Sequence, residues 1–150
     1  MKSNTVDVKI KLLTKTAKVP TKGTDGSAAY DLYVDIDKKI VMQPMSTLLV
    51  DTGIALSIPK GYCGLVLPRS GISLKSPIRI SNAPGLIDSD YTGPIKVIID
   101  NIGQGFATID PGTRIAQLMI MPVPEVRFLE TDTLDETIRG ENGFGSTGTK

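Results

Sequence analysis

The chain has 150 residues, of which 17 are cationic and 16 anionic, with one cysteine and no histidine. This length corresponds to one domain with a hydrophobic core, and the balanced charge excludes a field strong enough to hold a nucleic-acid polymer. The missing histidine excludes Ser-His-Asp and Cys-His catalysis, and the lone Cys63 excludes an intrachain disulfide or a thiolate zinc cluster. Carboxylate chemistry remains, typically with a hard cation such as Mg²⁺ and a phosphorylated substrate.

Apolar and polar residues alternate along much of the chain, and this period of two predicts β-strands. The strands predicted in chain order are 6–12, 48–58, 63–67, 95–99 and 115–121. The last two are more continuously apolar, which is typical of strands buried on both faces. Turns rich in Gly and Pro separate the strands, and only 70–75 and 133–138 show helical signals. We therefore predict one all-β domain, built as a sandwich, barrel or jelly roll.

The N-terminus alternates charged and apolar residues without the hydrophobic stretch of a secretory signal, and no long apolar run occurs in the chain. No block of like charge occurs either, so the charge pattern does not indicate a polymeric partner. We therefore expect a soluble, cytoplasmic protein with no membrane partner.

Two segments place polar side chains where strands meet turns. The first, 27–32, contains Asp31 beside small residues, and a lone Asp in a strand is more often a turn or edge residue than a functional one. The second is Pro68-Arg69-Ser70-Gly71, in which the proline ends a strand and Arg69 and Ser70 begin a helical turn. A guanidinium, a hydroxyl and helix-start N–H groups suit an anion. A capped helix with a surface arginine explains the same residues equally well.

A third segment, 82–93, contains two neighbouring carboxylates. In extended backbone, Asp88 and Asp90 project to one side and Tyr91 to the other. The two carboxylates suit a metal ion, or one suits a water molecule while the other braces the loop; alternatively, both satisfy turn amides in a hairpin. The fourth polar feature is Gln117, inside an apolar strand, where it either closes a structural hydrogen-bond network or faces a site.

The last residues, 139–148, are rich in glycine and contain one arginine, one aromatic ring and two hydroxyls. Residues 143–148 spell the dinucleotide fingerprint G-x-G-x-x-G, but no helix can follow because only Thr149 and Lys150 remain. Backbone N–H groups, hydroxyls and a guanidinium suit phosphate oxygens, and an aromatic ring suits a base. A flap that closes over a phosphorylated ligand and a solvated tail are therefore the two interpretations.

Taken in order, these segments resemble the five motifs of the homotrimeric dUTPases (deoxyuridine triphosphate nucleotidohydrolases), over Ala28 to Gly148. The resemblance implies a jelly-roll domain, a distorted β-barrel, over residues 1–138 and a flexible nucleotide-binding flap over 139–150. It also implies a C3 homotrimer with three active sites at subunit junctions, each drawing residues from all three chains. The implied reaction is hydrolysis of dUTP to dUMP and pyrophosphate with Mg²⁺ bridging the phosphates. This reaction keeps uracil out of DNA and supplies dUMP for thymidylate synthesis.

The resemblance also implies roles at the base and the sugar. Asp88 matches the carboxylate that orients and deprotonates the water attacking the α-phosphorus. Tyr91 matches the ring packed against the deoxyribose, where a 2′-hydroxyl would collide. Asn82 and the backbone through Gly85 to Tyr91 match the turn that pairs with uracil and refuses cytosine.

The remaining matches concern the phosphates and the flap. Arg69, Ser70 and Gly71 match the phosphate-binding motif, with Ser70 near the α,β-bridging oxygen. Gln117 resembles the residue that contacts phosphate or metal-bound water, and Asp31 the carboxylate that supports this polar network. Catalytic roles are thus implied for Asp88, Ser70 and Gln117, and no side chain is expected to bind Mg²⁺ directly. In the flap, Phe144 is expected to stack on uracil, and the other residues expected to bind substrate are Arg139, Gly145, Ser146 and Thr147.

Two alternative functions remain open. A dCTP deaminase shares the jelly roll and the trimer, but its tail lacks the Gly-Phe-Gly-Ser-Thr-Gly flap of this chain. A dUTP-responsive regulatory protein that contacts another protein is compatible with the motifs as an additional or substitute role. Two departures from the family pattern bear on the site: Pro84 removes one backbone donor from the uracil-reading turn, and Ser76-Pro77 follows the second motif.

Overall fold

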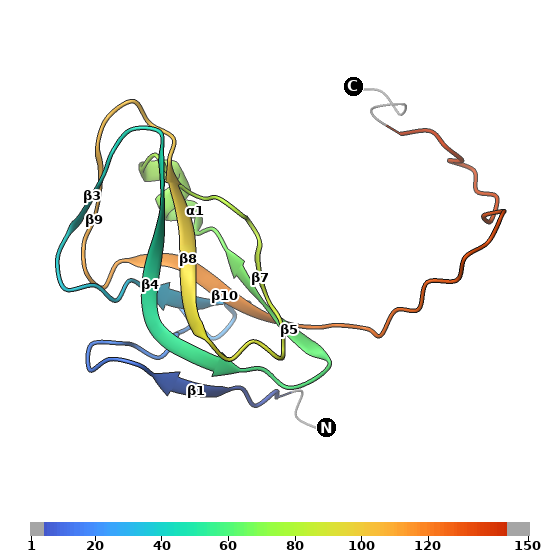
Figure 1. Ribbon diagram of the computed structural model, residues 1–150, viewed down its shortest axis with the longest axis horizontal. Coiled ribbons are helices and arrows are strands. Elements are labelled where there is room, and N and C mark those ends of the chain that lie inside the picture. Colours follow the sequence, from blue (N-terminus) through green and yellow to red (C-terminus); the bar gives the residue numbers. More distant parts are fainter. Residues whose placement is uncertain (1–4, 144–150) are drawn as a thin grey trace.

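The computed structural model describes residues 5–143 and is built almost entirely of β-strands, as the sequence predicts (Figure 1). One short helix, α1 (Ser70–Lys75), follows the fifth strand. The strands are β1 (Lys9–Leu12), β2 (Tyr30–Tyr33), β3 (Ile40–Met42), β4 (Ser46–Ser57), β5 (Tyr62–Leu67), β6 (Ile78–Ile80), β7 (Gly85–Ile87), β8 (Pro94–Asn101), β9 (Ala107–Ile109) and β10 (Arg114–Pro122).

The strands with long alternating patterns lie where the sequence predicts them, at β1, β4, β5, β8 and β10. The helical turn at 70–75 is confirmed, and it ends where Pro77 holds Ser76 in extended backbone. The helical turn predicted at 133–138 is wrong, because that segment has no helix. Its apolar side chains Leu134 and Ile138 are fully exposed, and a single helical turn without packing is unstable in water.

The strands form two four-stranded antiparallel sheets and one two-stranded antiparallel sheet. The first sheet has the order β1-β4-β8-β6, the second has the order β2-β10-β5-β7, and β3 pairs with β9. No pairing between the two large sheets closes a barrel within residues 5–143, so the arrangement there is two facing sheets. Their inner faces meet in one core, which contains Val97 and Ile99 of β8 together with Leu32 and Ile115 of the second sheet.

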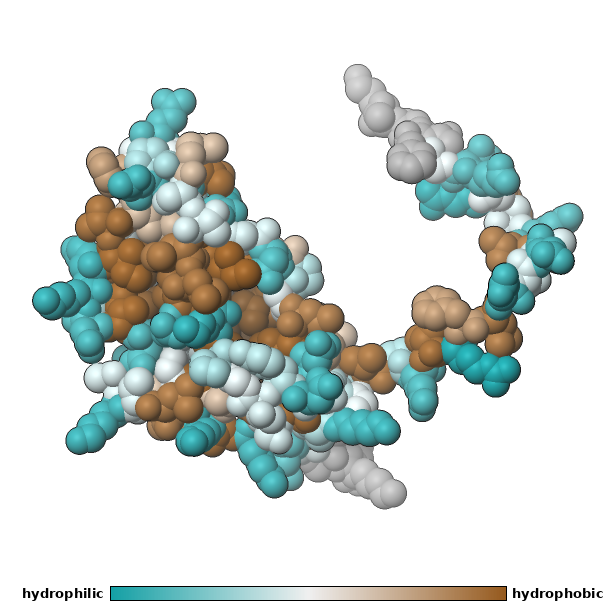
Figure 2. Space-filling model, viewed as in Figure 1, coloured by the Kyte–Doolittle hydropathy of each residue, from teal (hydrophilic) through white to brown (hydrophobic). Residues whose placement is uncertain are grey.

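The outer face of the first sheet is less covered than the sequence predicts. Along β8, Ile95, Val97 and Ile99 are buried, but the intervening Ile98 is only half-buried. Its cross-strand partner on β4, Leu49, is 53% exposed. Burial on both faces is therefore only partly seen in a single chain. Figure 2 shows apolar residues gathered on the surface over β4 and β8.

After β10 the chain leaves the body. Residues 123–143 contain no strand or helix, and they run outward from the two sheets (Figure 1). We call this segment the C-terminal arm. Its large apolar side chains are exposed: Val126, Phe128, Leu129, Leu134 and Ile138. Exposed apolar residues in such number are typical of a segment that packs on another chain.

Candidate active site

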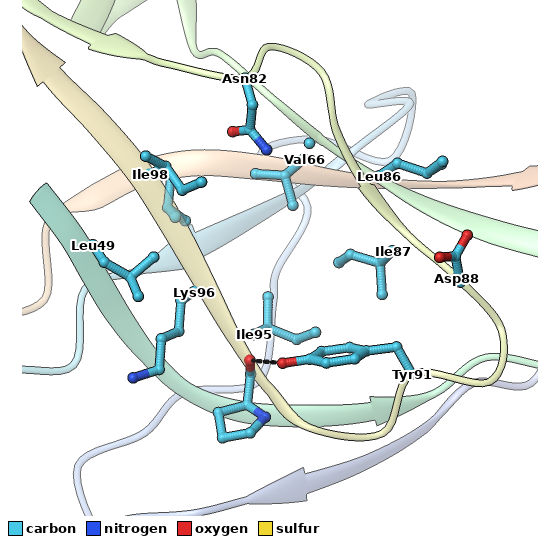
Figure 3. A pocket seen from close by; sticks show the side chains of 13 residues that line it. Leu49, Val66, Asn82, Leu86, Ile87, Asp88, Tyr91, Ile95, Lys96 and Ile98 are labelled. Atoms are coloured by element: carbon cyan, nitrogen blue, oxygen red, sulfur yellow. Dashed lines mark hydrogen bonds between the residues drawn. The ribbon is translucent and has the colours of Figure 1, made fainter. Parts of the chain in front are cut away.

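A pocket of about 320 Å³ lies where the two sheets separate, between β7 of one sheet and β8 of the other (Figure 3). This volume is at the lower end of small-molecule sites. The pocket is named the nucleoside pocket after the role that the sequence resemblance implies for Asn82 and Tyr91. It is lined by Leu49, Val66, Asn82, Gly85, Leu86, Ile87, Asp88, Tyr91, Pro94, Ile95, Lys96, Val97 and Ile98. Its walls are thus mainly apolar, with a carboxylate, an amide and a phenol among them.

The turn 88–93 joins β7 to β8 and brings two of the sequence-predicted residues to the nucleoside pocket. The Tyr91 N–H donates to the Asp88 carbonyl at 3.2 Å, and the Tyr91 hydroxyl donates to the Pro94 carbonyl at 2.9 Å. Figure 3 shows the ring reaching from the loop toward Ile95. The expectation that Asp88 and Tyr91 project to opposite sides of extended backbone is wrong, because the segment turns and both residues line the same pocket.

Asn82 lies at the same pocket as Asp88 and Tyr91. A Cβ at Gly85 would lie 3.3 Å from Asn82 Nδ2 and 3.3 Å from Val66 Cβ, so glycine allows the amide to approach the backbone of β7 closely. Asp90 is exposed and is not among the residues that line the pocket. The structure therefore brings Asn82, Gly85, Asp88 and Tyr91 together and leaves Asp90 outside.

A second pocket, of about 360 Å³, lies on the outer face of the sheet β2-β10-β5-β7 beside the start of α1. The strand register explains its composition. Asp31 of β2 is opposite Gln117 of β10, which is opposite Leu67 of β5, and directly opposed residues point to the same face. We call it the phosphate pocket, after the role that the sequence resemblance implies for Arg69 and Ser70. It is lined by Gly23, Ser27, Ala28, Ala29, Asp31, Leu67, Arg69, Ser70, Gly71, Arg114, Gln117 and Met119.

Asp31 is the electrostatic centre of the phosphate pocket. Its carboxylate accepts Arg69 Nε at 2.7 Å on one oxygen and Arg114 Nη1 at 3.1 Å on the other. Arg69 Nη1 also donates to the Arg114 carbonyl at 3.0 Å. The side chains of Asp31, Arg69 and Arg114 are 10%, 25% and 51% exposed. The cluster therefore holds two guanidiniums around one buried carboxylate, and it carries one net positive charge toward the pocket.

This geometry decides between the interpretations left open for Arg69 and Asp31. Arg69 occupies the N-cap position of α1, where no side-chain cap hydrogen bond is made. It is not a solvated surface arginine, because the Asp31 carboxylate holds it. Asp31 does lie on an edge strand, β2, but its carboxylate is buried in an ion pair and is not a solvated edge group.

Gln117 has both of the roles considered for it. Its Nε2 donates to the Pro68 carbonyl at 2.8 Å, which ties β10 to the segment before α1. The same side chain lines the phosphate pocket and is half-buried. With one N–H bound to Pro68, the amide oxygen and the second N–H remain for a ligand.

Sequence reasoning missed Arg114 as a site residue. A strand period of two places residues three apart on opposite faces, which separates Arg114 from Gln117. The pairing of β10 with β2 shifts its register between Arg114 and Ala116, and this bulge returns Arg114 to the Asp31 side. A register shift cannot be read from an apolar run, so the sequence contains no signal for it.

The two pockets share no lining residue within the chain. Arg139 lies on the C-terminal arm, where its Nε donates to the Asn142 carbonyl at 2.9 Å, and it lines neither pocket. The flap residues Phe144, Gly145, Ser146 and Thr147 lie outside the described residues. A single chain thus brings the predicted site residues together as two separate groups and leaves Arg139 apart.

Within residues 5–143, no three His, Cys, Asp or Glu side chains gather as a metal site would require. In that range there is also no helix with the length and apolarity needed to cross a membrane.

Comparison with known proteins gives consistent matches. The family model described as dUTPase matches residues 15–148. A deoxyuridine 5′-triphosphate nucleotidohydrolase of Hydrogenobaculum sp. (strain Y04AAS1) is 43% identical over 94% of this chain and 97% of its own length. One from Syntrophotalea carbinolica is 44% identical over 96% of this chain and 98% of its own. The solved structure of Staphylococcus bacteriophage 80alpha dUTPase with dUPNHPP has a TM-score of 0.87 and 30% identity, covering 98% of this chain and 100% of that chain.

The fold and these matches define the class as the all-β nucleotidohydrolases. Within that class, the chain belongs to the dUTPase family. The resemblance read from the sequence is thereby confirmed.

Proposed function

We propose that this protein hydrolyses dUTP to dUMP and pyrophosphate with Mg²⁺, at sites that a homotrimer assembles from the nucleoside pocket, the phosphate pocket and the flap. Membership in the dUTPase family supports the activity. The observation that supports the residue assignment is that Asn82, Asp88 and Tyr91 line one pocket of small-molecule size.

The nucleoside pocket suits a flat base and a deoxyribose. Val66, Ile87 and Ile95 supply an apolar wall. Asn82, with the backbone from Gly85 onward, offers the amides and carbonyls that pair with the edge of uracil. The Tyr91 ring packs against the sugar at C2′, where a hydroxyl would collide with it and remain without a hydrogen-bond partner.

The phosphate pocket suits the triphosphate. Asp31 orients Arg69, so that the guanidinium meets a phosphate oxygen without the entropic cost of ordering a free side chain. Arg114 adds a second guanidinium beside the same carboxylate. Ser70 and Gly71 add a hydroxyl and backbone N–H groups, and Ser70 stabilises the charge that develops on the α,β-bridging oxygen.

Asp88 acts as the general base. Its carboxylate lies exposed at the nucleoside pocket, where water and the α-phosphorus both reach it. It accepts a proton from the water that attacks phosphorus, and the bond from the α-phosphorus to the bridging oxygen breaks to release pyrophosphate. Such a base contributes roughly 10²–10⁴-fold to the rate.

The donor set fits Mg²⁺ held through substrate and not by a protein cage. Mg²⁺ prefers octahedral oxygen ligands and usually keeps several waters. Asp31 is engaged by two guanidiniums, and residues 5–143 offer no cluster of three acidic side chains. When bound, Mg²⁺ supplies positive charge to the phosphate oxygens. The Gln117 amide oxygen, which lines the phosphate pocket, would accept a hydrogen bond from a water of the bound ion. A structure of phi11 phage dUTPase, 25% identical to this chain, is described as showing the coordination of a structural Mg(II) ion.

Three observations support a C3 homotrimer. The two pockets share no residue, which suits sites whose halves come from different chains. An apolar face over β4 and β8 is uncovered, and the C-terminal arm has exposed apolar side chains. In the trimer, residues 139–150 form the flap over a site, with Phe144 on uracil and Arg139, Gly145, Ser146 and Thr147 at the phosphates. For the cellular role, we propose that the enzyme acts in the cytoplasm, keeps uracil out of DNA and supplies dUMP for thymidylate synthesis.

A regulatory role is compatible with this assignment. The 80alpha phage dUTPase is described as controlling transfer of virulence genes by a proto-oncogenic G protein-like mechanism. A dUTP-responsive protein contact in the present chain would use the same nucleotide site. The dCTP deaminase alternative has no comparable support, because the family model and the relatives are dUTPases.

The test is pyrophosphate release from dUTP, dCTP, dTTP and UTP with Mg²⁺, run beside light scattering for subunit number. Asp88→Asn keeps the shape but removes the base, so we expect kcat to fall at least ~10²-fold with KM nearly unchanged. Asp90→Asn is the matched control, because Asp90 lies on the same turn but outside the pocket. Equal activity of the two variants would contradict the role of Asp88, and a monomer would contradict the assembly.

A further inference from the structure

Gly93 lies directly against the Tyr91 ring in the turn before β8. A Cβ at position 93 would lie 2.7 Å from the Tyr91 hydroxyl oxygen, 2.8 Å from Cζ and 3.0 Å from Cε2. Separations below 3.0 Å, such as the first two, are essentially absent from real Cβ contacts. Any side chain at position 93 and the present position of the ring therefore exclude each other.

The backbone at Gly93 does not itself require glycine. The glycines with positive φ are 53, 61, 112 and 140, and Gly93 is not one of them within residues 5–143. A positive φ is therefore not the reason for glycine at this position. The three heavy atoms nearest to a Cβ at this position, chain neighbours aside, all belong to the side chain of Tyr91.

Tyr91 is held by hydrogen bonds at its backbone and at its hydroxyl. The Tyr91 N–H is bound by the Asp88 carbonyl at 3.2 Å, and the hydroxyl is bound to the Pro94 carbonyl at 2.9 Å. Gly93 lies between these two attachment points in the sequence. The rigid ring can move only as a whole, by rotation about its two side-chain torsions. Such a rotation breaks the hydrogen bond from the hydroxyl to the Pro94 carbonyl.

We propose that Gly93 is a positioning residue for sugar selection: its missing side chain, with the Pro94 carbonyl, sets where the Tyr91 ring stands and hence whether a 2′-hydroxyl fits. This inference rests on the proposed function, in which the ring packs against the deoxyribose. Displacements of about 1 Å in such contacts change rates by large factors. The ligand class concerned is the 2′-deoxynucleotide as opposed to the ribonucleotide.

The experiment is a double-mutant cycle with wild type, Gly93→Ala, Tyr91→Ala and the double variant. The first measurement is the ratio of kcat/KM for dUTP to that for UTP. We expect Gly93→Ala to lower this ratio about tenfold, within the range that small shape changes in a pocket produce. In the Tyr91→Ala background, Gly93→Ala is expected to change the ratio less than about twofold, because the ring it displaces is gone.

The second measurement is urea unfolding of the same four proteins, which needs no substrate. We expect Gly93→Ala to lower the midpoint only when Tyr91 is present. If Gly93→Ala alone fails to fold, recovery of folding in the double variant supports the contact. Gly105→Ala is the matched control, since Gly105 has no atom within 4 Å of its Cβ position and no positive φ, and it should behave as wild type.

The outcomes separate the two proposals. A wild-type protein that does not favour dUTP over UTP overturns the role of Tyr91 and, with it, the role of Gly93. A selective wild type with an unchanged ratio in Gly93→Ala overturns only the inference about Gly93. Equal effects of Gly93→Ala with and without Tyr91, in either measurement, also overturn it, because the cause is then the backbone.

Discussion

Replacement of Asp31 by asparagine tests the electrostatic centre of the phosphate pocket. The substitution preserves size and keeps one oxygen that can accept from Arg69, but it removes the negative charge between two guanidiniums. The new NH₂ group faces the Arg114 Nη1 donor or displaces it. Arg69 keeps its hydrogen bond to the Arg114 carbonyl and one to the uncharged amide oxygen, but it loses its ion pair.

The cost of this change follows from the geometry. A hydrogen bond to a charged group contributes about 1.5–3 kcal/mol, and here two such bonds, at 2.7 and 3.1 Å, lose their ionic character. The contact with Arg114 is discounted because half of that side chain is in solvent. We expect the free energy of unfolding to fall by about 2–4 kcal/mol. We also expect KM for dUTP to rise about tenfold, since Arg69 is no longer held toward the phosphates.

The assay is urea unfolding at one fixed protein concentration, because assembly makes stability depend on concentration. The matched control is Asp110→Asn, which breaks a 3.1 Å ion pair with Lys39 whose side chains are 55% and 63% exposed. That pair should contribute less than about 1 kcal/mol. Equal midpoint shifts for the two variants would refute the reasoning, because burial would then have no bearing on the value of the Asp31 contacts.

Two further predictions concern the sheet and the flap. Gly53→Ala places a Cβ against the Asp35 carboxylate and 2.8 Å from Ala17 Cβ at a φ of +68°, so the free energy of unfolding should fall by about 3–5 kcal/mol. The control is Gly61→Ala, at φ +86° with no atom within 4 Å of its Cβ position, for which the free energy of unfolding should fall by about 1–2 kcal/mol. Similar losses in the two variants would show that the collision at position 53 does not matter. Deletion of Gly140–Lys150 should leave the unfolding midpoint nearly unchanged but abolish most pyrophosphate release, whereas an unfolded product would show that the tail is structural.

The sequence was sufficient for the fold class because the long strands have clear alternation. The apolar residues of 48–58 and 95–99 predict β4 and β8, and in the structure many of them fill the inner face of the sheet. β3, β6, β7 and β9 have three residues each, too few for a period of two to stand out. The predicted helical turn at 133–138 failed because local propensity counted for more in the prediction than the absence of packing.

The candidate site was predictable only where its residues are neighbours in the sequence. Asn82, Asp88 and Tyr91 belong to one segment, and the turn brings them to one pocket. That Asp31 and Gln117 meet depends on the register of β2 against β10, which the sequence does not specify.

The nucleoside pocket has one wall on each of the two facing sheets, and the turn 88–93 connects the two walls. Any breathing of the sandwich therefore widens or narrows the space in which the base and sugar lie. A destabilised core, even far from the pocket, would therefore lower the affinity for the nucleotide before any strand separates from its sheet. In this architecture, the affinity for substrate depends on how closely the two sheets pack against each other.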